Sequence, residues 1–153
     1  MQKITPFLWF DGQLADAMAL YTSTFPGSTV VQTFDMNGEL FTATFRVGDI
    51  EISGMNASGG PAFNEAISLS IDCVDQAEVD YYWDALLVGG GKEVQCGWLV
   101  DRFGISWQVV PRRMNELLQD PDPARAQRAM AEMMTQIKLD VAALERAADG
   151  IQA

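Results

Sequence analysis

The sequence contains no histidine, and this absence restricts its chemistry more than any other feature. Histidine is the commonest general base near neutral pH and the commonest ligand of transition metals. Catalytic sites of the Ser-His-Asp and Cys-His types are therefore excluded. We expect no bound metal and no cofactor.

Basic residues are also scarce, since 10 lysines and arginines stand against 21 aspartates and glutamates. The formal net charge of −11 repels nucleic-acid phosphates and anionic membrane surfaces. We therefore expect neither nucleic acid nor a membrane as a partner.

Long hydrophobic runs are missing as well, because every apolar stretch is interrupted well short of the roughly 18 residues that a membrane span needs. The start, from Met1 to Phe7, lacks the apolar segment of an export signal. Cys73 and Cys96 are the only cysteines, and we expect both to be reduced thiols. These features predict a cytoplasmic protein.

What the sequence does contain is typical of a globular protein. Its 153 residues are 48% hydrophobic and 20% charged, which is enough apolar material for a core without disulfide or metal support. We expect a single domain over residues 1–153.

Signals in the first half predict one helix among four strands. Apolar residues recur at helical spacing from Leu14 to Phe25, and Pro26-Gly27 ends the pattern. The strands are expected at Ile4–Phe10, Thr29–Asp35, Glu39–Val47 and Ile50–Met55. The order is β-α-β-β-β.

The same order returns after a loop from Asn56 to Asn64. Asp75 and Glu78 form a possible capping pair before a helix with an apolar face, and Gly89-Gly90-Gly91 ends that helix. The strands are expected at Ala66–Asp72, Lys92–Gln95, Trp98–Asp101 and Ile105–Val110.

The repeat predicts an α+β fold of two βαβββ modules, at about residues 3–57 and 65–111, followed by C-terminal helices over about 112–149. Aligning Val47–Ser53 with Arg102–Gln108 matches turn to turn and strand to strand. That alignment places Ser53 opposite Gln108 and predicts a pseudo-twofold relation between the modules.

Motifs along nearly the whole chain resemble the PhnB-like, demethylubiquinone-methyltransferase-like family. They are Thr5-Pro-Phe-Leu-Trp-Phe-Asp11, Gly59-Gly-Pro61, Phe63-Asn64, Asp75-Gln-Ala-Glu-Val-Asp80, Cys96-Gly-Trp98, Asp101, Gly104-Ile-Ser-Trp-Gln108, Pro111 and Lys138-Leu-Asp140. The resemblance implies the vicinal oxygen chelate fold of the glyoxalase and bleomycin-resistance proteins, and usually a homodimer.

The resemblance also implies four positions where enzymes of that superfamily hold a divalent metal, one on the first and one on the last strand of each module. Our placement of them is Pro6, Ser53, Ser68 and Gln108, and a shift by two residues on the fourth strand supplies only Glu51. These are not the imidazole and carboxylate ligands that such metals need. The methyltransferase description likewise lacks a glycine-rich turn from strand to helix, because Gly89–Gly91 follows a helix.

Seven residues are candidates for lining a ligand cleft, and no catalytic residue is assigned: Ser53, Met55, Asn56, Ser68, Cys96, Trp98 and Gln108. Each also has a structural interpretation. The polar strand residues could face solvent, Trp98 could be core, Asn56 could satisfy a turn, and Cys96 has no activating base beside it in the sequence.

Three functions remain open. The first is a metal-independent small-molecule-binding protein, the second an enzyme acting on a quinone-like or aromatic compound, and the third a dimeric structural or regulatory protein. A C-terminal apolar stripe, which is either continuous or broken near Lys138-Leu-Asp140, favours a homodimer, with packing on its own chain as the alternative. Its residues are Met130, Met133, Met134, Ile137, Val141 and Leu144.

Overall fold

The computed structural model describes residues 2–151, and the chain divides into two compact units. The first unit ends at Ala62 and the second begins at Phe63. Each unit contains its own four-stranded sheet, so each is described separately.

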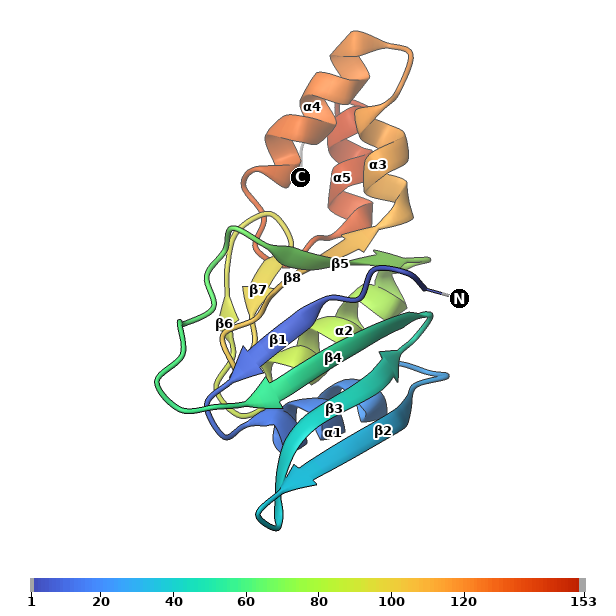
Figure 1. Ribbon diagram of the computed structural model, residues 1–153. Helices are drawn as coiled ribbons and strands as arrows, with labels where there is room; N and C mark the ends of the chain where they lie inside the picture. Colours follow the sequence, from blue (N-terminus) through green and yellow to red (C-terminus); the bar gives the residue numbers. More distant parts are fainter. Residues whose placement is uncertain (1, 152–153) are drawn as a thin grey trace. The chain divides into compact units, whose positions relative to one another are not determined.

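The first unit is a four-stranded sheet with one helix on one of its faces (Figure 1). Its elements are β1 (Phe7–Phe10), α1 (Leu14–Thr24), β2 (Thr29–Met36), β3 (Glu39–Val47) and β4 (Ile50–Asn56). The spatial order is β1-β4-β3-β2, in which β1 runs parallel to β4 and the other neighbours are antiparallel.

Helix α1 covers one face of this sheet and leaves the other without a helix. Leu14 and Tyr21 of α1 are fully buried, as are Phe45 and Ile52 of the strands. Gly54 lies below the helix, where a Cβ would come within 2.8 Å of Leu14 Cδ1. The expected alternation along β4, with Ile52 buried and its odd-numbered neighbours on the other face, is confirmed.

The second unit repeats this order of elements. They are β5 (Ser68–Cys73), α2 (Gln76–Leu87), β6 (Lys92–Glu93), β7 (Trp98–Val100) and β8 (Ser106–Pro111). The sheet order β5-β8-β7-β6 reproduces that of the first unit, with the first strand again parallel to the last. The predicted pair of βαβββ modules is therefore confirmed.

The first and sixth strands are shorter than the sequence suggested by more than one residue. The first begins at Phe7 and not at Ile4, because Pro6 has no N–H to donate to a ladder. The sixth ends at Glu93, because the chain turns before Cys96, whose φ is +62°.

The ends of α2 agree with the sequence signals. The Asp75 side chain accepts a hydrogen bond from the Glu78 N–H at 3.0 Å, and the Glu78 carboxylate accepts one from the Val74 N–H at 2.8 Å. This reciprocal cap fixes the start of the helix. At the other end the Gly91 N–H donates to the Leu87 carbonyl, so the glycines stop the helix.

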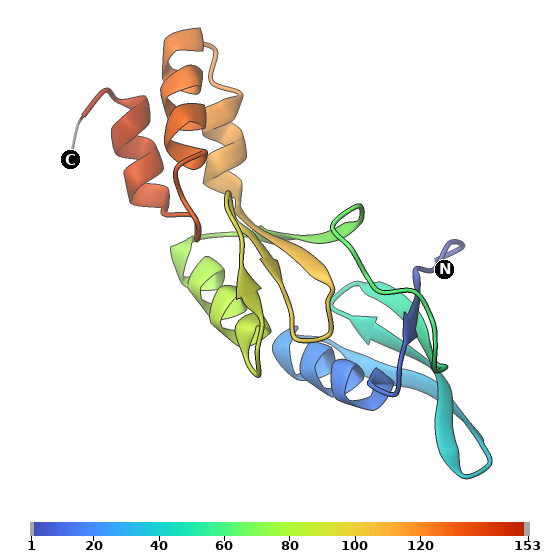
Figure 2. The ribbon, with the colours of Figure 1, turned by 90° about the vertical axis from the view of Figure 1, so that its left-hand side faces the viewer.

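Three further helices follow β8 and pack on one another within the second unit (Figure 2). They are α3 (Arg112–Leu118), α4 (Pro123–Met133) and α5 (Val141–Ala148). The predicted apolar stripe is broken by the segment 135–140, after which Asp140 caps α5. Leu144 is fully buried and Met133 packs against the helical core, whereas Met130, Met134 and Ile137 are exposed.

None of the helices in residues 2–151 is both long and apolar enough to cross a membrane.

Candidate functional site

The face of the second sheet opposite α2 carries most of the candidate residues. Register partners in a sheet share a face, and Trp98, Gln108 and Ser70 lie in one cross-strand row. Val100, Ser106 and Ser68 form the adjacent row. We call these six residues the open face of the second sheet. The intervening side chains of Leu99, Trp107 and Val109 are buried on the α2 side.

Two of the predicted site residues are hydrogen-bonded to each other on this face. The Gln108 Nε2 donates to the Ser68 Oγ at 2.9 Å, from the adjacent strand β8 to β5. The side chains of Ser68 and Gln108 are half-buried and that of Trp98 is also half-buried. Ser68, Trp98 and Gln108 are thus brought onto one surface.

A buried carboxylate fixes the turn that leads into β8. Asp101 Oδ1 accepts hydrogen bonds from the backbone N–H groups of Phe103 at 2.9 Å and Ile105 at 3.0 Å. Asp101 Oδ2 accepts one from the Trp107 indole N–H at 2.9 Å. Because charged acceptors make strong hydrogen bonds, Asp101 determines where Ser106 and Gln108 lie along the open face. It is a positioning residue.

A cavity of about 310 Å³ lies at the start of β8, between the turn and the segment at the beginning of the second unit. Its lining combines apolar walls with polar groups: Phe63, Asn64, Glu65, Val100, Gly104 and Ser106. The volume is at the lower end of the range for small-molecule sites. None of these six residues is among the seven predicted cleft residues. Ser106 could have been predicted, because it alternates along its strand in the same way as Gln108.

In the first unit, the face opposite α1 contains two more candidates. Ser53 and Met55 alternate with buried Ile52, and the Ser53 and Thr44 hydroxyls are 2.8 Å apart in a hydrogen bond. Ser53 pairs in register with Phe7, so the residue that shares its face is Phe7 and not Pro6. The metal position placed at Pro6 therefore corresponds to Phe7, the next residue along the chain.

Aromatic side chains are exposed on this face of the first sheet. Phe7 is 58% exposed and Trp9 is 37% exposed. The Trp9 indole N–H donates to the Ala57 carbonyl at 2.7 Å, and a Cβ on Gly60 would come within 2.4 Å of the indole ring. The Gly-Pro loop therefore packs directly on Trp9 and requires glycine at position 60.

Asn56 does not share a face with Ser53 and Met55. It lies on the α1 side, where its Oδ1 accepts the Leu14 N–H at 2.9 Å and its Nδ2 donates to the Leu40 carbonyl at 3.2 Å. Asn56 also lines a depression of about 800 Å³ beside the β2–β3 hairpin. Its hydrogen bonds serve the start of α1, which supports the structural interpretation of this residue.

Neither cysteine is placed among the strand residues of the open face. Cys96 lies in the β6–β7 turn and its N–H donates to the Gln136 carbonyl at 2.8 Å. Cys73 is fully buried, and burial together with the charges of Glu78 and Asp72 raises the pKa of its thiol to about 12. The Cys73 thiol is therefore protonated at neutral pH and is not an activated nucleophile.

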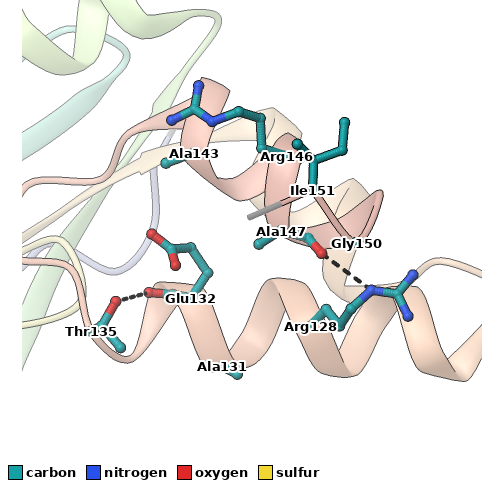
Figure 3. A pocket seen from close by; sticks show the side chains of 9 residues that line it. All are labelled: Arg128, Ala131, Glu132, Thr135, Ala143, Arg146, Ala147, Gly150 and Ile151. Carbon is teal, nitrogen blue, oxygen red and sulfur yellow. Dashed lines mark hydrogen bonds between the residues drawn. The ribbon is translucent and has the colours of Figure 1, made fainter. Parts of the chain in front are cut away.

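A second hollow, of about 480 Å³, lies between α4 and α5 (Figure 3). Arg128 at its edge donates to the Ala147 and Ala148 carbonyls at the end of α5. Alanines 131, 143 and 147 form much of the lining. The Arg128 guanidinium thus satisfies carbonyls that a helix end leaves unpaired, and we assign the hollow to helix packing.

The four residues at the metal-ligand positions do not fit the divalent metal that superfamily enzymes hold. Phe7, Ser53, Ser68 and Gln108 are neither imidazoles nor carboxylates, and three of them already hydrogen-bond within the protein. Within residues 2–151, no three side chains of the types His, Cys, Asp and Glu gather into a metal-binding cluster.

A nucleoside methyl donor is not fitted either. The chain passes from strand to helix at Asp11–Gln13, at Val74–Asp75 and directly from β8 into α3. At the first two places a side chain caps the first helical N–H groups, from Asn56 and from Asp75. Among these three places in residues 2–151, only the first contains a glycine, Gly12, and none is the glycine-rich turn that binds a nucleoside cofactor.

A family model and a solved structure relate this chain to the same family. The model of the 3-demethylubiquinone-9 3-methyltransferase family matches residues 2–110. A Bacillus cereus PhnB protein, provisionally described as a 3-demethylubiquinone-9 3-methyltransferase, is 32% identical, with a TM-score of 0.65 over 72% of this chain and 99% of that one. No curated protein matches.

More distant structures share the fold. Protein PA1353 from Pseudomonas aeruginosa is 22% identical, with a TM-score of 0.60 over 72% of this chain and 98% of that one. A Bacillus subtilis YycE protein, described as glyoxalase/fosfomycin resistance-like, is 17% identical, with a TM-score of 0.52 over 70% of this chain and 88% of that one. The family model ends at residue 110, so α3, α4 and α5 lie beyond the matched part.

Proposed function

Since this chain belongs to the 3-demethylubiquinone-9 3-methyltransferase family of PhnB-like proteins in the vicinal oxygen chelate superfamily, we propose that it is a metal-independent small-molecule-binding protein. The observation that carries the proposal is the open face of the second sheet. Hydroxyl, amide and indole groups stand there beside a cavity of about 310 Å³, where the superfamily would use metal ligands. Such a mixture of apolar walls and a few polar groups is typical of ligand sites.

The side chains Ser53, Ser68 and Gln108 support binding without a metal. Each is neutral, and each is held by a hydrogen bond to a neighbour on its own sheet. Neutral, pre-oriented groups of this kind recognise hydroxyl, carbonyl or amide groups of an organic molecule.

Native mass spectrometry of protein purified from its own host tests this function. We expect an organic molecule of discrete mass on the folded chain and less than stoichiometric Zn, Ni, Mn or Fe by elemental analysis. A Gln108→Leu variant should lose the organic molecule, whereas Gln127→Leu, on an exposed position of α4, should retain it. One tightly bound transition metal per wild-type chain, lost in Gln108→Leu, would contradict the proposal.

A second candidate function is the conversion of an aromatic or quinone-like compound. It is supported by the family description and by the exposed rings of Phe7 and Trp9. Turnover of a demethylated quinone in the presence of a methyl donor would favour it. Retention of the unchanged compound would favour binding alone.

We also propose that the protein resides in the cytoplasm. Cys73 and Cys96 are both free thiols, and Cys96 is half-exposed in its turn. A reducing compartment preserves such thiols without a disulfide partner.

A further inference from the structure

The Ser106 hydroxyl is buried without a hydrogen bond. Ser106 is 1% exposed, and its Oγ is the one buried side-chain nitrogen or oxygen in residues 2–151 that lacks a partner. Its register partner Ser68 accepts a hydrogen bond from the Gln108 amide. The buried Asp101 carboxylate accepts from the Phe103 and Ile105 N–H groups and from the Trp107 indole. Burying an unpaired hydroxyl is unfavourable, so its presence needs an explanation.

Ser106 is one of the residues in the wall of the cavity at the start of β8. Phe63 and Val100 provide apolar surface there, while Asn64 and Glu65 are exposed at the side of the preceding segment. Gly104 has a φ of +91°, which favours glycine, and a Cβ at this position would lie 3.7 Å from Phe63 Cβ. The cavity is therefore bounded by the Phe63 side chain on one side and the β7–β8 turn on the other.

We propose that Ser106 is the polar anchor of the ligand, and that the ligand is a small uncharged ring compound carrying one carbonyl or hydroxyl group. This inference rests on the proposed function and specifies it. The ring would pack against Phe63 and Val100, while its oxygen pairs with the Ser106 hydroxyl, which can both donate and accept.

Charge argues for a neutral ligand. The cavity lining contains one carboxylate, Glu65, and no basic side chain, and the whole chain carries a net charge of −11. An anion would therefore be repelled. A cation would be desolvated beside Ser106 without a buried carboxylate to pair with it, because Glu65 is exposed to water.

Phenol and benzene are suitable probes because they share a ring and differ in one hydroxyl group. Titration of isotope-labelled protein, followed through the amide signals of Phe63 and Ser106, should give tighter binding of phenol than of benzene by about fivefold, the value of one net hydrogen bond. Benzoate should bind more weakly than phenol. In Ser106→Ala the preference for phenol should disappear.

The unliganded Ser106→Ala variant provides a second measurement. Removing a buried hydroxyl that has no partner should raise the melting temperature, because the desolvated group is deleted and its volume is small. Ser58→Ala is the matched control, since Ser58 is exposed in the loop after β4 and lies neither on the open face nor in the lining of the cavity. That control should change neither the melting temperature nor the phenol preference.

Each contrary result has a definite meaning. If Ser106→Ala lowers the melting temperature, or binds phenol as selectively as the wild type, the hydroxyl serves the fold and the inference is overturned. Absence of phenol-induced shifts at Phe63 and Ser106 overturns it too. The proposed function would survive either result if native mass spectrometry still finds an organic ligand, and it would fail separately if a stoichiometric metal is found.

Discussion

Cys73 illustrates how a single residue links burial to pH dependence. Its side chain is fully buried at the end of β5, and burial, followed by the negative charges of Glu78 and Asp72, raises the pKa of the thiol from 9.0 to about 12. The folded protein therefore keeps the thiol protonated over a range in which the unfolded chain ionises. Within this range the folded state binds one more proton than the unfolded state, so the free energy of unfolding falls as pH rises.

We expect the free energy of unfolding to fall between about pH 9 and pH 12, with Cys73 contributing a slope of about 1.4 kcal/mol per pH unit. The contribution is fully present below pH 9 and is lost as pH rises towards 12. Urea denaturation of the wild type and Cys73→Ala at several pH values measures it. The variant should have the shallower slope.

Tyr82 and Val79 allow this prediction to be controlled. The pKa of Tyr82 is also raised, chiefly by burial, so it adds a slope of the same sign that remains in Cys73→Ala. Val79→Ala, which shortens a fully buried side chain without removing an ionisable group, should keep the wild-type slope. Equal slopes for the wild type and Cys73→Ala would show that the thiol ionises alike in the folded and unfolded chains.

At the scale of single residues, strand alternation predicted which face of the sheet each residue occupies, but not its hydrogen-bond partner. Ser53, Met55 and Gln108 could be placed because alternate residues share a face. The Gln108–Ser68 hydrogen bond joins residues 40 positions apart and depends on the register of β5 against β8. The unpaired Ser106 hydroxyl follows from that same register, so the sequence alone could not reveal it.

At the scale of elements, Gln76 connects α2 to the C-terminal helices. Its Nε2 donates to the Leu139 carbonyl at 3.0 Å and its Oε1 accepts the Val141 N–H at 2.8 Å. Beside it, the Lys138 ammonium lies 2.8 Å from Asp80 and lowers the pKa of that carboxyl. The linker between α4 and α5 is thus held by the N-terminal turns of α2.

We expect Gln76→Ala to destabilise the protein by about 1 to 2 kcal/mol, because a backbone carbonyl and a backbone N–H both lose their partner. Hydrogen exchange should show the loss locally, with faster exchange at Val141 than in the wild type. Gln127→Ala, on an exposed position of α4, should leave both quantities unchanged. Unaltered protection of Val141 in Gln76→Ala would mean that Gln76 does not hold the linker.

The elements themselves were largely predictable because each carries a local signal. The Asp75–Glu78 cap, the apolar spacing of α2 and the glycines after it are all contained within 17 residues. The sequence left open whether the C-terminal apolar stripe is continuous or broken near Lys138-Leu-Asp140, because the reason for the break lies outside the segment. The linker is held in a non-helical path because its carbonyls accept hydrogen bonds from Cys96, Gly97 and Gln76. The Leu139 side chain also packs directly against Gly97.

At the scale of the whole molecule, the C-terminal helices lie beyond the part of the chain that the family model matches. The Bacillus cereus protein is covered over 99% of its length by 72% of this chain, and the family model ends at residue 110. Helices α3, α4 and α5 have a core of their own that includes Met114, Leu117 and Leu144. They also expose an apolar surface at the end of α4 and in the linker that follows it.

That surface is the basis of a dimer prediction. Met130 is 42% exposed, Met134 61% and Ile137 47%, and they lie close together in sequence at the end of α4 and in the linker. Exposed apolar groups gathered on one side favour association, and a twofold contact between identical chains is the commonest way to bury them. Methionine side chains adapt readily to such a contact. The alternative is a monomer in which these side chains face water.

We expect light scattering to report twice the mass of one chain for the wild type, and Met134→Glu with Ile137→Glu to shift it towards the mass of one chain. Two carboxylates at the centre of an apolar contact would be desolvated without partners, which makes the dimer unfavourable. Ile67→Glu with Val88→Glu adds the same charge at other exposed positions of the second unit and should remain dimeric. A wild type that stays monomeric at high micromolar concentration, or a control pair that dissociates equally, would show that these α4 and linker residues do not form the contact.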